Sequence, residues 1–98
     1  MTINTESTVK IKMFTKTVCP TCKIAKQQLS FLPVPVDIEE INIEDESYVF
    51  KDFKGDIHDP TYYLEAHLNS MSTPTFLFED GHVIRGFNEG ELRTYLGL

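Results

Sequence analysis

The chain has 98 residues, 41% of them hydrophobic and 24% charged, a composition typical of one globular domain rather than of a disordered chain. Its 9 basic and 15 acidic residues give a formal net charge of −6. This charge argues against a surface for nucleic acid or for an anionic membrane, because both partners require a basic patch.

Residues 1–8 are polar and show no periodicity, and we expect them to form a loose tail ahead of one domain at residues 9–98. The tail has neither the basic start nor the apolar middle of a signal peptide. No apolar run in the chain approaches the ~20 residues of a membrane span. Two cysteines without a secretion signal favour the reducing cytoplasm, where a CxxC pair more often serves redox or metal chemistry than a structural disulfide.

The first predicted element is a strand at residues 9–15, where apolar and polar side chains alternate until Phe14 breaks the pattern. A helix is predicted over residues 23–32 and is ended by Pro33 and Pro35. The positions that recur at helical spacing on its inner face are Cys22, Ala25, Leu29 and Leu32.

A second strand is predicted at about residues 38–43. The apolar alternation changes phase between Ile38 and Ile41, and we expect the turn before the strand to absorb this change. The order strand, helix, strand predicts a parallel pair with a right-handed crossover.

Residues 44–72 carry the weakest patterns in the chain. A short helix is predicted over residues 46–53, closing at Gly55. Asp59 and Pro60 then suit the N-cap and first position of another helix, predicted over residues 61–69 with Leu64 and Leu68 inward. His67 lies in this helix, and we interpret it as a surface or half-buried side chain rather than a catalytic one.

The last third of the chain predicts a strand–strand–helix unit. Residues 75–79 and 82–85 are expected to form antiparallel strands, joined by a two-residue hairpin turn at Asp80-Gly81. Asn88, followed three residues later by Glu91, predicts a capping box that opens a helix running through Leu98.

The cysteines of Cys19-Pro20-Thr21-Cys22 are the strongest candidates for chemistry. At the opening of a helix, free backbone N–H groups and the helix dipole favour a thiolate, so we expect Cys19 to have a lowered pKa. Cys22 lies about one helical turn later, where it could attack a mixed disulfide formed on Cys19, and should be the more buried of the two. A structural disulfide or half of a zinc site is the alternative, although zinc usually needs four ligands.

The chain resembles a glutaredoxin of the thioredoxin superfamily over residues 9–98. Three segments carry the resemblance: the strand and lysine leading into Cys-Pro-Thr-Cys at residues 13–22, Ser72-Thr73-Pro74, and Arg85-Gly86-Phe87-Asn88. The resemblance implies the α/β thioredoxin fold, with order βαβ–α–ββα and a four-stranded mixed sheet flanked by helices. It also implies a cis peptide bond before Pro74.

The same resemblance implies the site residues. Cys19 and Cys22 would be catalytic, reducing protein disulfides or glutathione-mixed disulfides. The residues expected to bind substrate or glutathione are Lys16, Thr21, Thr73, Pro74, Phe87 and Asn88. Thr21 stands where the family usually has Tyr, so one aromatic wall beside glutathione is missing. Lys23 we interpret as ordinary solvated helix surface.

The sequence does not decide between two electron donors, and the partner proteins differ with the donor. The resemblance implies no bound cofactor and glutathione as co-substrate. The Gly86-Phe87 pair, however, is more like the sequence of glutaredoxin-like redoxins that receive electrons from thioredoxin reductase and supply ribonucleotide reductase. A monomer is expected. A redox-inert binding or adaptor domain, or a metal-bridged dimer sharing Cys19, is the alternative from another class.

Overall fold

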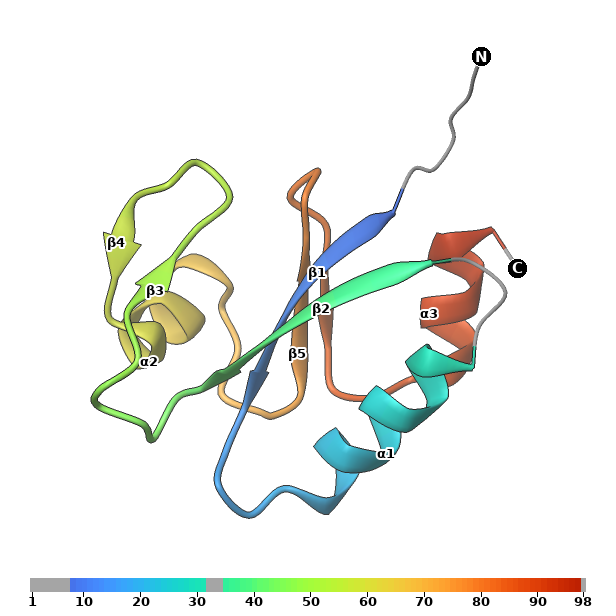
Figure 1. The fold of residues 1–98 in the computed structure, drawn as a ribbon, viewed down its shortest axis with the longest axis horizontal. Coiled ribbons are helices and arrows are strands. Elements are labelled where there is room, and N and C mark those ends of the chain that lie inside the picture. The colour runs from blue at the N-terminus through green and yellow to red at the C-terminus, as the bar shows by residue number, and fades with distance from the viewer. Residues whose placement is uncertain (1–7, 32–34, 98) are drawn as a thin grey trace.

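A computed structural model describes residues 8–31 and 35–97. The order of elements along the chain is β1 (Val9–Thr15), α1 (Pro20–Ser30), β2 (Val36–Asn42), β3 (Phe50–Lys51), β4 (Ile57–His58), α2 (Pro60–Tyr62), the π-helical turn η1 (Tyr63–His67), β5 (Thr75–Phe78), β6 (Val83–Arg85) and α3 (Glu89–Leu96). Four strands form one mixed sheet in the order β2-β1-β5-β6, and β3 and β4 pair separately (Figure 1).

The register of the main sheet confirms the predicted parallel and antiparallel pairings. β1 runs parallel to β2, with Val9 opposite Val36 and Thr15 opposite Asn42. β5 is antiparallel to β1, and β6 is antiparallel to β5. The sheet is therefore the four-stranded mixed sheet that the α/β prediction required.

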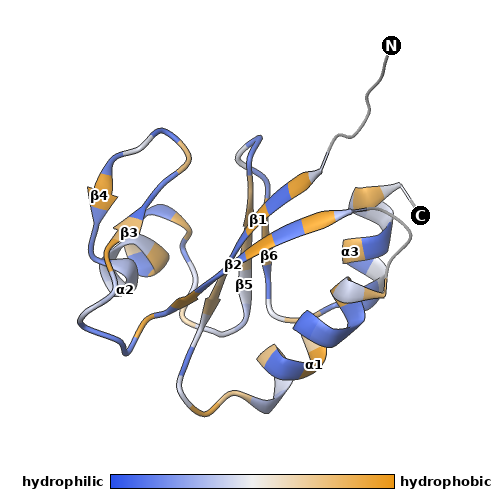
Figure 2. Ribbon diagram, in the orientation of Figure 1, coloured by the Kyte–Doolittle hydropathy of each residue, from blue (hydrophilic) through white to orange (hydrophobic). Residues whose placement is uncertain are grey.

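Two apolar clusters lie on opposite faces of this sheet. Successive residues within a strand point to opposite faces of the sheet, and Figure 2 shows alternating hydrophobic and hydrophilic bands along β1 and β2. The cluster under α1 and α3 consists of Ile11, Met13, Ala25, Leu29, Phe76, Phe78, Ile84 and Leu92. The cluster under the β3–β4 hairpin, α2 and η1 consists of Phe14, Ile41, Phe50, Leu64, Leu68 and Leu77.

The two-faced core explains the phase changes seen in the sequence. Phe14 breaks the alternation of β1 because it packs into the second cluster, whereas Met13 packs into the first. In β2, Ile38 packs against the first cluster and Ile41 is buried in the second. The expected turn before the second strand is therefore wrong: β2 starts at Val36 and runs unbroken through the phase change.

The predicted short helix at residues 46–53 is also wrong. Phe50 and Lys51 instead pair with His58 and Ile57 in the antiparallel β3–β4 hairpin. The local sequence suits either structure, but Phe50 is fully buried and packs edge-to-face against Phe14 at 5.2 Å between ring centroids. This long-range contact favours the extended conformation.

The next helical segment starts as predicted. Asp59 is its N-cap and accepts the backbone N–H groups of Thr61 (2.9 Å) and Tyr62 (3.2 Å), and Leu64 and Leu68 are buried. The helix widens into the π-helical turn η1 and ends at His67, two residues earlier than predicted, before Asn69 takes a φ of 52°. His67 is exposed, as the surface interpretation required.

The chain ends in the predicted strand–strand–helix unit, with one difference in the turn. Phe78 N donates to the His82 carbonyl at 2.9 Å, so the loop holds three residues, Glu79 to Gly81, rather than two. Gly81, at φ 93°, takes the left-handed position that such a loop requires. Asn88 caps α3 by accepting the backbone N–H of Glu91 at 3.0 Å. Leu98, like Leu32 and Pro33, lies outside the described residues.

Candidate active site

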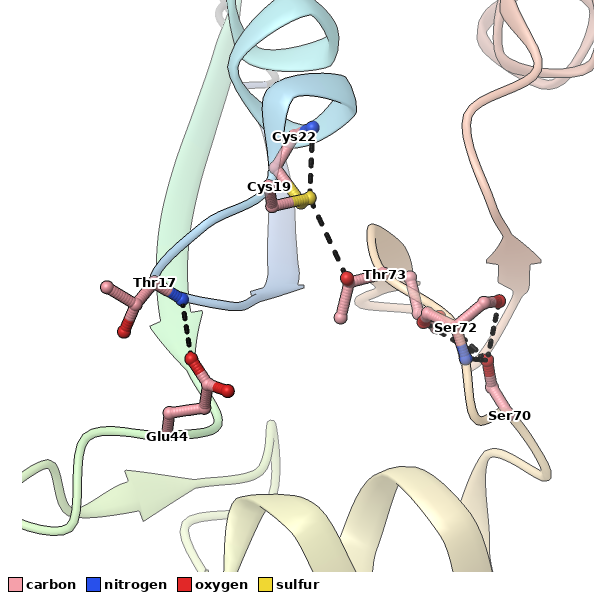
Figure 3. The surroundings of a disulfide bond; sticks show 8 residues. Thr17, Cys19, Cys22, Glu44, Ser70, Ser72 and Thr73 are labelled. Carbon is pink, nitrogen blue, oxygen red and sulfur yellow. Dashed lines mark hydrogen bonds between the residues drawn. A yellow bond between two sulfur atoms is a disulfide. The ribbon is translucent and has the colours of Figure 1, made fainter.

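The cysteines lie at the junction between β1 and α1. Cys19 is the N-cap of α1, and its sulfur accepts the backbone N–H of Cys22 at 3.2 Å (Figure 3). Pro20 occupies the first helical position, where a missing N–H removes no helical hydrogen bond. The helix therefore starts one residue after the first sulfur, and its free N–H groups and positive dipole end face that sulfur.

Cys19 and Cys22 are joined by a disulfide, with their Cα atoms 5.2 Å apart. Cys22 is the more buried, as predicted, but the difference is small: 4% of Cys22 is exposed against 8% of Cys19. Cys19 is thus more enclosed than a freely accessible nucleophile. Both residues line a cleft.

A loop from the start of β5 lies beside the first sulfur. Thr73 Oγ1 is 3.6 Å from Cys19 Sγ, within hydrogen-bond reach of sulfur (Figure 3). The Thr73–Pro74 peptide bond is cis, as the resemblance implied. The loop is tied down by side chains that the sequence did not single out. Thr75 Oγ1 donates to the Ser72 carbonyl at 2.7 Å and shares a 2.8 Å hydrogen bond with Ser70.

The segment before Cys19 is anchored to the end of β2. Thr17 N donates to Glu44 Oε1 at 2.9 Å (Figure 3). Asn42 Nδ2 donates to Thr17 Oγ1 at 3.2 Å. The hydrogen bonds from Thr17 to the carboxylate lower the pKa of Glu44, and the charge of Lys16 adds to the effect. The anchor is therefore formed with an ionised Glu44.

The cleft beside the disulfide has a volume of about 580 Å³ and lies between α1, the segment after β1 and the end of β2. Its lining residues are Thr15, Lys16, Thr17, Cys19, Cys22, Lys23, Lys26, Gln27, Ser30, Glu40 and Asn42. It brings together the two sulfurs and three lysines. The arrangement can hold a disulfide-bearing chain against Cys19 with cations close by.

The family follows from comparison with known proteins. The family model described as Glutaredoxin matches residues 11–83, which hold most of β1, both cysteines, the Thr73–Pro74 bond and the start of β6. The chain belongs to the glutaredoxin family. No curated protein sequence matched it.

Solved structures agree with this assignment. The glutaredoxin from Methanosarcina mazei Go1 is 25% identical, with a TM-score of 0.66 over 95% of this chain and 85% of that one. The Methanosarcina acetivorans methanoredoxin is also 25% identical, with a TM-score of 0.61 over 91% and 85%. A thioredoxin-like protein, BC3987, is 27% identical, with a TM-score of 0.65 over 86% and 96%. The fold is the thioredoxin fold, and the family is one of redox oxidoreductases.

In this glutaredoxin-family chain, some of the predicted binding residues lie beside the cysteines and others do not. Lys16 lines the cleft with both cysteines, and Thr73 lies against Cys19. Thr21 is exposed on the first turn of α1. Phe87 packs against the core cluster under α1 and α3, and Asn88 is occupied in capping α3. Both of these last residues therefore have structural tasks, and their binding role stays a prediction.

Sequence reasoning missed the residues that anchor the site and those that line the far part of the cleft. Asn42 and Glu44 lie 25 and 27 positions from Thr17, so their contact depends on the parallel pairing of β1 with β2 and leaves no local signal. A local signal does exist for the far part of the cleft, because Lys23, Lys26 and Ser30 recur on one side of α1.

Among the residues that the structure describes, no helix has the length and hydrophobicity that a membrane span needs. Within residues 8–31 and 35–97, no three His, Cys, Asp or Glu side chains are grouped in a way that could hold a metal ion.

Proposed function

We propose that this chain is a dithiol–disulfide oxidoreductase that reduces protein disulfides or glutathione-mixed disulfides through Cys19 and Cys22. The observation that carries the proposal is the Cys19–Cys22 disulfide at the first turn of α1, with Cys19 Sγ accepting a helical N–H and Thr73 alongside. A structural disulfide has no need of a helix N-terminus or of an adjoining cleft. Membership of the glutaredoxin family supports the same reaction class.

The reaction has two exchange steps. In the reduced protein, the Cys19 thiolate attacks one sulfur of the substrate disulfide, forms a new S–S bond to it, and expels the other substrate sulfur as a thiolate. The Cys22 thiolate then attacks Cys19 Sγ, forms the Cys19–Cys22 disulfide and releases the second substrate thiol. The substrate gains two electrons and the protein loses two.

Each protein group has a task in these steps. The start of α1 stabilises negative charge on Cys19 before it attacks the substrate disulfide. The short Cα–Cα distance of 5.2 Å keeps Cys22 within reach of the mixed disulfide. Lys16 lines the cleft as a cation near the sulfurs and suits a substrate carboxylate.

Two donors could return the electrons: glutathione, or a flavoprotein of the thioredoxin reductase type. Thr21 in place of an aromatic residue removes one wall of a glutathione site, and Asn88 already caps α3, so these observations favour the flavoprotein. Ribonucleotide reductase is a candidate target on the same resemblance. Oxidised protein should be offered each donor system separately, and the faster recharging identifies the donor.

Two substitutions test the proposal. Cys19→Ser should abolish turnover of every disulfide substrate. Cys22→Ser should abolish reduction of protein disulfides, because nothing resolves the mixed disulfide, while glutathione-mixed disulfides need only Cys19. Intact protein-disulfide reduction in Cys22→Ser would rule out the two-thiol mechanism. Wild-type protein that reduces no disulfide would favour a redox-inert adaptor.

A further inference from the structure

The stretch around the disulfide is basic, although the chain as a whole is acidic. Residues 16–35 contain Lys16, Lys23 and Lys26 and no Asp or Glu, whereas the full chain carries a net charge of −6. All three lysines line the cleft that holds both cysteines. The basic charge of this stretch is therefore gathered at the place where a substrate disulfide must arrive.

The protein's own carboxylates offset this positive charge only in part. Lys26 forms an ion pair with Glu40 of β2, the only carboxylate among the lining residues of the cleft. Within the described part of the chain, Lys16 and Lys23 make no ion pair. The ionised carboxylate of Glu44, which accepts Thr17 N, lies near Lys16 and offsets part of its charge. The cleft thus keeps an excess of positive charge.

The shape of the cleft suits an extended peptide. Along α1 it is lined from Cys22 through Lys23, Lys26 and Gln27 to Ser30. The eight helical steps from Cys22 to Ser30 rise about 12 Å, which corresponds to about four residues of extended chain. Lys23 and Lys26 are three positions apart and so lie on neighbouring parts of the helix surface. Gln27, Ser30 and Asn42 add polar groups that can bond a peptide backbone.

We propose that this cleft binds an acidic segment next to the disulfide of a protein substrate, with its carboxylates against Lys16 and Lys23. The inference rests on the proposed function and adds a substrate class to it. Charge complementarity of this kind raises the rate of encounter and selects among partners. Lys23, which the sequence placed on ordinary helix surface, becomes a specificity residue.

The test is a single-turnover reaction of fully reduced protein with two disulfide peptides that differ only in a run of Asp or Asn beside the disulfide. Because nearby carboxylates also change the reactivity of a disulfide, each rate is divided by that with dithiothreitol. We expect the normalised rate to be about fivefold higher for the Asp peptide at low salt, because each exposed ion pair strengthens binding by at most a few-fold. The preference should vanish at about 1 M salt.

Lys23→Glu should remove or reverse the preference. Lys54→Glu is the matched control, because it makes the same charge change in the β3–β4 hairpin, which packs on the opposite face of the sheet from α1. This control should keep the preference. Equal normalised rates for the two peptides, or a preference that survives in Lys23→Glu, would overturn the inference and leave the redox activity standing. Failure of wild-type protein to reduce either peptide would overturn the proposed function as well.

Discussion

The carboxylate of Glu44 illustrates how a residue far from the sulfurs in sequence can govern where they lie. It accepts the backbone N–H of Thr17, two residues before Cys19, and so ties the active-site segment to the end of β2. Its pKa is lowered chiefly by this bond, so the bond is formed above the ordinary pKa of 4.5 and is lost as the pH falls through the lowered value. The neighbouring Asp45 differs, because its carboxylate accepts hydrogen bonds from Ser47, two residues along the chain.

Glu44→Ala is therefore expected to lower kcat/KM for disulfide reduction about two- to fivefold, because the segment before Cys19 loses its anchor and the reacting sulfur is held less well. Asp45→Ala is the matched control and should leave the rate unchanged. The measurement is kcat/KM for both variants at neutral pH. Equal losses in the two variants would show that Glu44 has no positioning role.

A carboxylate–tyrosine pair, Glu39 with Tyr48, predicts the alkaline behaviour of the protein. Burial, together with a hydrogen bond to Glu39 and that residue's charge, raises the pKa of Tyr48 from 10.0 to about 12. A phenol whose pKa is raised by folding stabilises the native state fully below pH 10 and loses that contribution as the pH rises through about 12. Wild-type protein should therefore lose stability more steeply between these values than Tyr48→Phe. Parallel urea midpoints for the two proteins would contradict the assignment.

At the scale of elements, Asn88 at the start of α3 either caps the helix alone or also binds substrate, and substitutions distinguish the two roles. Its side chain accepts the backbone N–H of Glu91 at 3.0 Å, and removing such a cap usually costs about 1 kcal/mol. Asn88→Ala should destabilise the protein by that amount, and Asn88→Ser, which can also cap, should restore most of it. If glutathione turnover follows stability across both variants, the residue is a cap alone. Activity lost in Asn88→Ser at native stability would show that the amide binds substrate.

The β3–β4 hairpin depends on one aromatic ring. Phe50 is fully buried and packs against Phe14 and, at 5.0 Å between centroids, against Tyr63. Phe50→Ala should cost about 3–5 kcal/mol of unfolding free energy, the range for an aromatic ring lost from a core. Its neighbour Val49 is 62% exposed, so Val49→Ala should have little effect. Urea unfolding of both variants checks this, and similar losses would refute the packing account.

These elements show what the sequence could predict. Strong local signals, such as Asp59-Pro60, Asn88 with Glu91, and the alternation in β1, gave the helices and strands close to their observed bounds. The hairpin at Phe50 was missed because its conformation is decided by contact with Phe14, 36 positions away. The unbroken course of β2 was missed because a strand that buries first one face and then the other looks, in sequence, like a register slip.

At the scale of the whole molecule, the sheet separates two regions of different character. On one face α1 carries the disulfide and the basic cleft, and on the other the β3–β4 hairpin and η1 cover the second core cluster. The cysteines and the Thr73–Pro74 bond were foreseen because short motifs carry them. The cleft was not, because its wall combines α1 with Glu40 and Asn42 of β2, and only the folded sheet brings these together.

The most direct test of the account is to trap the mixed disulfide. Cys22→Ser protein, reduced and then mixed with a disulfide substrate, should accumulate a stable adduct on Cys19, located by mass spectrometry of its peptides. Cys19→Ser protein should form none at Cys22 on the same timescale, because Cys22 is the more buried sulfur and does not cap α1. An adduct on Cys22 in Cys19→Ser, or none on Cys19 in Cys22→Ser, would contradict the assignment of Cys19 as the attacking thiol.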